Sequence, residues 1–173
     1  AFVAWADNQV VGTVTTTNYQ NQMGWIGMVL VDPAYRGRGI ATRLLDSAIE
    51  ALEQVNTVLL DATPDGRRVY LRLGFTDMFG LKRVIIENKN PPPLNHRDGL
   101  RPMQASDLDA VAEWDARLLG CNRRALLESL RHLAPEYAWV CEKEGRLTGF
   151  SLGRRGSRFE YIGPLVAMND DIA

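Results

Sequence analysis

The feature that most constrains the fold is a pattern that occurs twice, in residues 1–16 and in residues 137–153. The copies read "AFVAWADNQVVGTVTT" and "YAWVCEKEGRLTGFSLG". Each contains an apolar strand, a polar or charged turn, and a second strand with a Gly near its start. Apolar runs bounded by polar turns are typical of antiparallel strands. The repetition predicts that the second half of the chain copies part of the first.

The first half is predicted to be a three-stranded meander followed by helices and further strands. From Ile40 to about Val55, apolar residues recur at helical spacing opposite charged residues, which is typical of an amphipathic helix. A short helix, "RRVYLRL" (67–73), is expected to end at Gly74. The predicted strands are "FVAWA" (2–6), "VVGTVTTTNY" (10–19), "MGWIGMVLVD" (23–32), "TVLLDA" (57–62), "FTDMF" (75–79) and "LKRVIIEN" (81–88).

A proline-rich segment divides the chain. "NKNPPPLNHRDG" contains three consecutive prolines and few apolar side chains, which favours an extended linker. We therefore place a first domain at residues 1–88, a linker at residues 89–99 and a second domain at residues 100–173.

The second domain is predicted to begin with a strand and two helices and to continue with another meander. Ser106 or Asp107 is expected to cap the first helix and Asn122 the second. The predicted elements are the strand "LRPMQ", the helices "DLDAVAEWDARLL" and "RRALLESLRHL", and the strands "YAWVCEKE", "RLTGFSLGRR" and "FEYIGPLVA". The predicted fold class is α/β of the α+β type, with a mixed, mostly antiparallel sheet and flanking helices.

Composition disfavours several classes of function. Twenty basic and 21 acidic residues give a net charge of -1, so no overall positive field recruits nucleic acid or an anionic membrane. Cys121 and Cys141 lack metal-ligand spacing and fit a reducing compartment. No apolar run approaches the roughly 20 residues that cross a bilayer. We expect a cytoplasmic protein without a metal. Because the chain opens inside an apolar run and lacks an initiator Met, we also expect a segment cut at both ends.

The stretch "VDPAYRGRGIATRLL" places two glycines and two arginines between a predicted strand and a predicted helix. Gly37 and Gly39 permit a sharp turn and remove the Cβ atoms that keep a ligand off the backbone. The helix N-terminus offers unpaired N–H groups and the positive end of the helix dipole. Arg36 and Arg38 add donors that suit phosphate oxygens. The pattern favours a phosphorylated ligand, and a turn with two solvated arginines is the alternative.

This stretch resembles the acyl-CoA-binding signature of the GNAT superfamily of N-acetyltransferases. In that signature, Gln or Arg is followed after two residues by Gly and then, after one residue, by Gly or Ala; here these are Arg36, Gly39 and Ala41. A second stretch, "VYLRLGF", resembles the family's later segment, where a Tyr stands four residues before Gly-Phe. The resemblance implies a GNAT-like acyl-CoA N-acyltransferase fold. It also implies transfer of an acetyl group from acetyl-CoA to a primary amine of a small molecule or protein, by direct attack in a ternary complex.

The resemblance further implies how the cosubstrate acetyl-CoA is held. Its pyrophosphate would lie on backbone amides of the loop, and its pantetheine arm would lie between two parallel strands that splay apart, "GMVLVD" and "TVLLDA". The implied binding residues are Val29, Leu30, Val31, Arg36, Gly37, Arg38, Gly39, Ile40 and Ala41.

Acetyl transfer needs a base for the amine proton and an acid for the leaving thiolate. Tyr70 in "VYLRLGF" is the candidate acid, because the pKa of a phenol, about 10, is close to that of a thiol. Packing against the sheet is the alternative role of Tyr70. Asp61, at the end of "TVLLDA", is the nearest carboxylate and the candidate base. A cap or turn role for Asp61, with a water chain or a residue outside the segment as the base, is equally compatible with the sequence.

The second copy departs from the family pattern at the loop. "VAMNDDIA" contains neither Gly nor Arg, and Asp170 and Asp171 would repel a phosphate. We expect the N-terminal part of a second, degenerate GNAT-like domain, after a first domain that lacks its first strand and helices. A non-catalytic acyl-CoA sensor or interaction module is the alternative function. The predicted partner is an amine acceptor, with no nucleic acid and no membrane, and a homodimer is left open.

Overall fold

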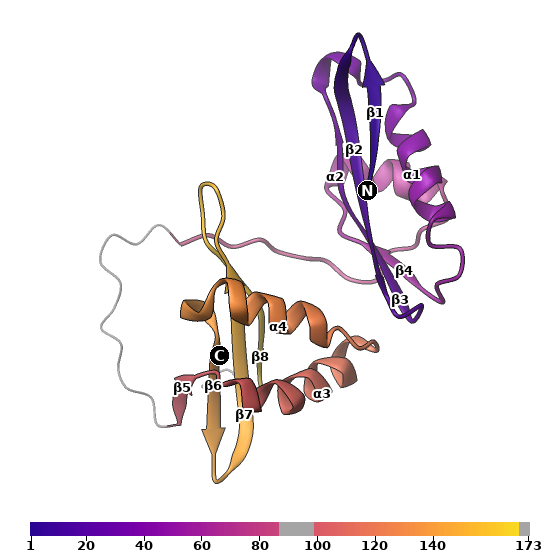
Figure 1. Ribbon diagram of the computed structural model, residues 1–173. Coiled ribbons are helices and arrows are strands. Elements are labelled where there is room, and N and C mark those ends of the chain that lie inside the picture. The colour runs from indigo at the N-terminus through magenta and orange to yellow at the C-terminus, as the bar shows by residue number, and fades with distance from the viewer. Residues whose placement is uncertain (87–98, 170–173) are drawn as a thin grey trace. The chain divides into compact units, whose positions relative to one another are not determined.

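The computed structural model describes residues 1–86 and 99–169 and contains two compact units (Figure 1). Unit 1 comprises Ala1–Glu87 and unit 2 comprises Asn88–Ala173. The predicted linker at residues 89–99 lies outside the described residues except for Gly99. In the part of the chain that is described, no helix is long and apolar enough to cross a membrane.

Unit 1 contains a four-stranded sheet whose first three strands form the predicted meander. Its strands follow one another in space as in sequence: β1 (Phe2–Ala6), β2 (Gln9–Tyr19), β3 (Met23–Val31) and β4 (Val58–Leu60). Asp7 and Asn8, with φ of 48° and 63°, form the tight turn between β1 and β2. β2 is antiparallel to both neighbours, whereas β4 is parallel to β3 because a helix connects these two strands.

α1 (Ile40–Glu50) packs its apolar stripe against one face of this sheet. The buried residues of the resulting core are Val14, Ile26, Leu44, Leu45, Ala48 and Leu52. The sequence predicted a helix to about Val55, but α1 ends at Glu50 and a turn follows. In that turn Leu52 reaches the sheet so closely that a Cβ at Gly24 would lie 2.9 Å from its Cδ1. The helix therefore ends where the turn brings Leu52 into the core.

α2 (Pro64–Arg72) replaces the predicted short helix at residues 67–73 and ends one residue earlier. It also begins three residues earlier than expected, because Thr63 caps it by accepting from Gly66 N at 3.2 Å. The two strands predicted after α2, residues 75–79 and 81–88, are wrong as far as they are described: residues up to 86 form no strand. Phe75 packs against the core of unit 1, but most of the other apolar side chains lie in solvent, with Val84 87 % exposed. The residue types favour a strand, but a strand also needs a neighbour with which to pair.

Unit 2 has the predicted order of a strand, two helices and a meander. Its antiparallel sheet has the spatial order β5-β6-β7-β8. The strands are β5 (Leu100–Pro102), β6 (Trp139–Lys143), β7 (Arg146–Arg154) and β8 (Tyr161–Ala167), and the helices are α3 (Leu108–Leu119) and α4 (Arg124–Leu133). Both helices lie on one face of the sheet (Figure 1). The core between them includes Leu108, Val111, Leu127, Val140, Phe150 and Leu152. The mixed, mostly antiparallel fold class is confirmed.

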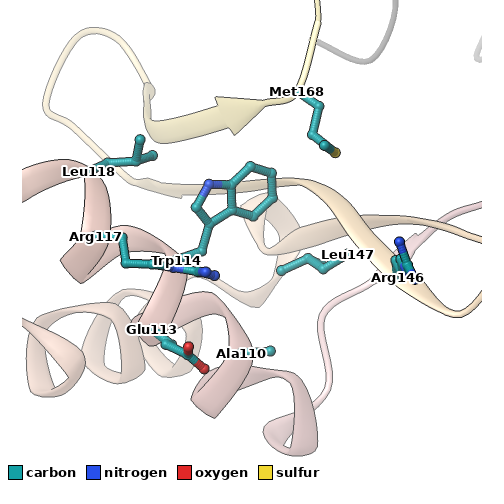
Figure 2. A pocket seen from close by; sticks show the side chains of 8 residues that line it. All are labelled: Ala110, Glu113, Trp114, Arg117, Leu118, Arg146, Leu147 and Met168. Carbon is teal, nitrogen blue, oxygen red and sulfur yellow. The ribbon is translucent and has the colours of Figure 1, made fainter.

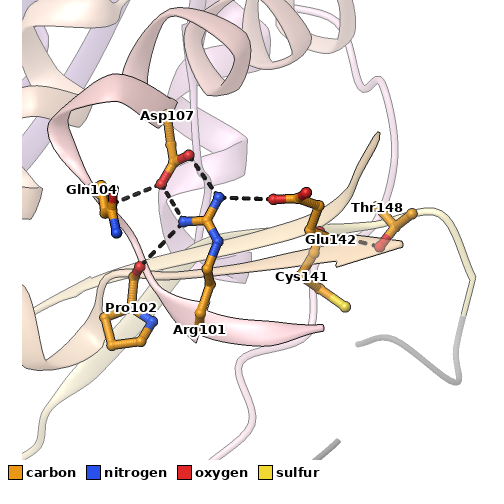
Figure 3. A network of polar contacts seen from close by, with 7 residues as sticks. All are labelled: Arg101, Pro102, Gln104, Asp107, Cys141, Glu142 and Thr148. Carbon is orange, nitrogen blue, oxygen red and sulfur yellow. Dashed lines mark hydrogen bonds and ion pairs between the residues drawn. The ribbon is translucent and has the colours of Figure 1, made fainter. Parts of the chain in front are cut away.

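A polar network joins β5 and β6 to the start of α3 (Figure 3). The guanidinium of Arg101 donates to Asp107 at 2.7 and 2.9 Å and to Glu142 at 2.9 Å. Asp107 also accepts from Gln104 N at 2.7 Å. Asp107 is the N-cap residue of α3, one of the two predicted, but its side chain forms no cap bond to this helix and binds Arg101 instead. The guanidinium lowers the pKa of Asp107.

The two meanders have matching strand registers. Gly12 of β2 pairs with Ala4 and Val31, and its counterpart Gly149 of β7 pairs with Cys141 and Ala167. Each first hairpin also has a register shift directly after Ala4 or Cys141. The internal repeat predicted from the sequence is therefore confirmed down to individual residue pairs.

Because the registers match, the exposure of equivalent residues in the two sheets can be compared. Val140 in β6 is fully buried beneath the helices of unit 2, whereas its counterpart in β1, Val3, is 51 % exposed. Val166 in β8 packs against the core of unit 2, whereas its counterpart in β3, Leu30, is 55 % exposed. The face that α3 and α4 cover in unit 2 therefore corresponds to an apolar, exposed face in the described part of unit 1.

Candidate functional site

The parallel strands β3 and β4 pair over a short distance and then diverge. Gly24 pairs with Val58 and Ile26 with Leu60, where β4 ends. On this side, the rest of β3 has no strand partner among the described residues. Met28, with φ of 51°, lies where the register with β2 shifts, and its carbonyl accepts from Thr13 Oγ1 at 2.9 Å. A bulge of this kind bends the strand.

The residues predicted to bind the pantetheine arm lie on this diverging part of β3. Val29, Leu30 and Val31 are its last three residues. Val29 packs against the core beneath α1, and Leu30 lies on the opposite face. Side chains on a strand point alternately to the two faces of the sheet. A ligand in the gap beside β3 would therefore contact the backbone N–H and C=O groups of its edge.

Two local hydrogen bonds fix the start of the loop after β3. Asp32 Oδ1 accepts from Ala34 N at 2.8 Å and begins a short 3₁₀ helix, Pro33–Tyr35. Arg36 Nε then donates to the Val31 carbonyl at 3.1 Å. These contacts close the turn on its inner side and leave the following residues in solvent.

Both loop glycines have φ of 75°, a conformation that L side chains rarely adopt. A Cβ built on Gly37 or Gly39 would meet nothing within 4 Å. The glycines are therefore required by backbone conformation and not by crowding, and the space above them is open.

Gly39 is also the N-cap residue of α1. The first intrahelical bond runs from Arg43 N to Gly39 O at 3.1 Å, so the preceding N–H groups of the first turn have no helical partners. No acidic residue stands in this first turn. Ile40 and Ala41, predicted to bind the cosubstrate, thus lie where the helix presents N–H groups and its positive dipole end, which favours an anion.

Tyr70 lies on α2 and is half-buried against the core of unit 1. Its ring meets Phe75 edge to face with centroids 6.2 Å apart. Burial raises the pKa of Tyr70, so the phenol keeps its proton at neutral pH. No hydrogen bond of the hydroxyl to another described residue is present. Both predicted roles, packing and proton donation, fit this environment.

Asp61 directly follows the last residue of β4, at the point where β3 and β4 diverge. The carboxylate is exposed and does not cap α2, which Thr63 caps. Its place at the end of a strand beside the gap is compatible with a base, but no second charged group among the described residues pairs with it.

Unit 2 carries a cavity of about 540 Å³ that sequence reasoning did not anticipate. Figure 2 shows Trp114 of α3 at its centre, between Arg117 and Arg146. The indole is held edge to face against Phe150, with centroids 5.8 Å apart. The lining residues are Ala110, Glu113, Trp114, Arg117, Leu118, Arg146, Leu147 and Met168. No sequence motif marked them, because they come from a helix, a hairpin and the end of a strand.

The predicted acidic turn of the second copy is only partly described. Met168 and Asn169 belong to the structure, whereas Asp170 and Asp171 lie outside the described residues. Among the described residues, Cys121, which is buried, and Cys141 form no disulfide. Among the described residues, no group of three or more potential ligands is placed to hold a metal ion.

Comparisons with known proteins agree with this architecture. The family model "Acetyltransferase (GNAT) family" matches residues 1–75, and the model "Acetyltransferase (GNAT) domain" matches residues 111–173. The first match contains the whole candidate site, from β3 to Phe75. The second contains α4 and the meander of unit 2.

Individual relatives match both units together. The chain is 25 % identical over 172 residues to the holothin acyltransferase of Pseudoalteromonas sp. (strain SANK 73390), which covers 99 % of this chain and 57 % of the relative. It is 24 % identical over 148 residues to the uncharacterized N-acetyltransferase YitH of Bacillus subtilis (strain 168), over 86 % of this chain and 52 % of the relative.

A solved structure from Pyrococcus horikoshii superimposes with a TM-score of 0.72 at 27 % identity, over 98 % of this chain and 56 % of that one. The chain thus spans about half the length of the relatives it matches. Two successive family matches and a fold shared across both units lead to one conclusion: the chain belongs to the GNAT superfamily of acetyltransferases, with two of its domains in tandem.

Proposed function

We propose that unit 1 binds acetyl-CoA and that the protein transfers the acetyl group to a primary amine of a small molecule or protein. The observation that carries this proposal is the position of the Gly37–Gly39 turn. It lies between the free part of β3 and the first turn of α1. An extended ligand that ends in phosphates can therefore contact a strand edge and a helix N-terminus at once.

The backbone amides from Arg38 to Ala41 are the proposed donors to the pyrophosphate. They stand at the positive end of α1, and the open space above both glycines lets phosphate oxygens approach the main chain. Arg36 and Arg38 supply further charged donors. Neither arginine forms an ion pair within the part of the chain that the structure describes.

The edge of β3 from Val29 to Val31 is the proposed partner of the pantetheine arm. Its amide groups would hydrogen-bond the backbone of β3 as an added strand does. β4 ends at Leu60 and leaves room for this arrangement. The thioester would then lie between the diverging strands, near Asp61.

In the proposed reaction the amine nitrogen attacks the thioester carbonyl carbon, the C–S bond breaks, and the acetyl group remains on nitrogen. Asp61 takes the proton that the amine loses, directly or through water. Tyr70 gives its proton to the departing thiolate, and its raised pKa ensures that it carries that proton beforehand. The description of the Pseudoalteromonas relative as an acyltransferase supports the reaction class.

A second candidate is a sensor that binds acyl-CoA without transfer. The two candidates differ in one measurable property, which is turnover. Free CoA should be released from acetyl-CoA in the presence of a suitable amine if the protein is an enzyme. A sensor would bind acetyl-CoA yet release none with any of a broad panel of amines.

The decisive variant is Tyr70→Phe. We expect it to lower kcat about ten- to a thousandfold, because a general acid acts in the transition state, while the Kd of acetyl-CoA changes little. Phe keeps the edge-to-face contact with Phe75, so the fold should be retained. Tyr137→Phe in unit 2 is the matched control and should leave kcat unchanged. An unchanged kcat in Tyr70→Phe would leave Tyr70 with a packing role.

A further inference from the structure

Tyr35 connects the candidate anion loop to the β1–β2 turn. Its hydroxyl donates to Asp7 Oδ2 at 2.6 Å and accepts from Gln9 Nε2 at 3.1 Å. These partners lie 28 and 26 residues away along the chain, so no local motif predicts the contact. The bond to Asp7 raises the pKa of Tyr35, and the phenol therefore remains a donor at neutral pH. Two residues at the β1–β2 turn thus hold the Tyr35 ring through its hydroxyl.

Arg38 lies over the ring that these bonds hold. Its guanidinium carbon is 4.9 Å from the centre of the Tyr35 ring, and one terminal nitrogen donates to the Ala34 carbonyl at 3.3 Å. A cation over an aromatic face is attracted by the ring electrons. The other N–H groups of Arg38 form no hydrogen bond to the described residues. Arg38 is therefore fixed by its stem and one nitrogen, with donors left over for a ligand.

The anchor residue Asp7 lies at a defined place in the sheet. Asp7 lies in a tight hairpin turn with positive φ, directly after the Ala6–Gln9 pair that ends the β1–β2 ladder. Sheet register thus determines where the Asp7 carboxylate lies, and the Tyr35 hydroxyl follows it. A long, flexible arginine loses rotamer freedom when it binds a phosphate, and an arginine that is already stacked loses less.

We infer that Asp7 and Tyr35 are positioning residues for Arg38 and that they raise the affinity of the site for a ligand carrying phosphate groups. The inference rests on the proposed function of the same loop. It assigns a role to the β1–β2 turn, which no sequence motif marks. It also predicts that the contribution is confined to the phosphate end of the ligand, since the Tyr35–Arg38 stack lies in the loop and not beside the diverging strands.

The test is a double-mutant cycle on acetyl-CoA binding by calorimetry, with wild type, Tyr35→Leu, Arg38→Ala and the double variant. We expect Tyr35→Leu to raise the Kd about two- to fivefold, the size of a cation–π contact at an exposed site. In the Arg38→Ala background the same change should have no effect, because there is no guanidinium left to position. Asp7→Ala should act in the same direction as Tyr35→Leu.

A phosphate-free acyl donor separates positioning from structure. The KM of S-acetylpantetheine should be unchanged in Tyr35→Leu, whereas a collapsed loop or strand would raise it. Tyr161→Leu is the matched control: this ring carries Arg154 at 4.0 Å in unit 2, and the change should leave acetyl-CoA affinity unaltered.

Two results would overturn the inference while the proposed function stands. One is an equal loss of acetyl-CoA affinity in both backgrounds, and the other is a raised KM for S-acetylpantetheine. Failure of the wild-type protein to bind acetyl-CoA at all would be a different result, because it removes the proposed function and the inference with it.

Discussion

Gly39 combines two requirements at one residue, since it takes up a left-handed φ and leaves open space above the N-terminus of α1. The sequence indicated both requirements, because a glycine permits a sharp turn and has no Cβ. The structure adds the backbone angle, a φ of 75°, and shows that nothing lies within 4 Å of a would-be Cβ. Substitutions at this position therefore affect both folding and binding, and a useful experiment must separate the two.

We expect Gly39→Glu to abolish acetyl-CoA binding, because it adds a Cβ and a negative charge where the phosphates would approach. The left-handed backbone should also cost about 1–2 kcal/mol of stability. Gly120→Glu is the matched control, since Gly120 ends α3 with φ of 81° and has nothing within 4 Å of its would-be Cβ. The control should lose similar stability and keep full binding. Unchanged acetyl-CoA affinity in Gly39→Glu would contradict the phosphate cradle.

At the scale of elements, α3 and α4 of unit 2 are joined by ion pairs that differ in burial. Arg123, just before α4, donates to Asp115 of α3 at 2.7 and 2.8 Å, and Asp115 is only 2 % exposed. Arg124, the next residue, pairs with the exposed side chains of Asp109 and Glu128. The first pair ties α3 to the start of α4 with a buried carboxylate, whereas the second lies on the surface.

Arg123→Met should destabilise unit 2 by about 3–5 kcal/mol, because it leaves a buried carboxylate without its cation. Arg124→Met should have a much smaller effect, since exposed ion pairs contribute little. Hydrogen exchange of the α3 and α4 amides reports on this unit alone and compares the two variants directly. Equal loss of protection in both would show that burial of Asp115 is not the deciding factor.

The Arg101–Asp107 contact makes the stability of unit 2 depend on pH. Because the folded state lowers the pKa of Asp107, its contribution is present above the unfolded value, about 3.9, and is lost as pH falls through the lower folded value. Asp107→Asn should therefore be less stable than wild type at pH 7, and the difference should shrink below about pH 4. Urea denaturation at both pH values measures it. A constant difference across pH would rule out the ionised carboxylate as its source.

At the scale of the whole molecule, the two meanders share a register but differ in the sheet face that helices cover. In unit 1, a Gly-rich loop and α1 follow the third strand. In unit 2, Asp170 and Asp171 follow β8 in the sequence but lie outside the described residues, so the degenerate loop of the second copy stays a prediction.

If the second copy is degenerate as predicted, one molecule of acetyl-CoA should bind per chain. Calorimetry should then give a stoichiometry of one for wild type and no binding for Gly39→Glu, because Asp170 and Asp171 would repel a phosphate in the second copy. Residual binding of one equivalent in Gly39→Glu would place a CoA site in unit 2 and contradict the degenerate assignment.

The sequence by itself determined the order of most strands and helices, the repeat, and the loop between Arg36 and Ala41. These features depend on local periodicity, on turn residues and on motif spacing, all of which act over short distances along the chain. It misjudged residues 75–86, where a strand-like composition has no strand to pair with.

The tertiary structure alone decided which distant residues meet. It ended β4 at Leu60 while β3 continues to Val31, and so opened the gap between them. It also brought Asp7 to Tyr35 across 28 residues, and it aimed the Asp107 carboxylate at Arg101 instead of the helix end. Each of these outcomes depends on strand register and on competition among several possible partners, and neither can be read from residue types along one segment.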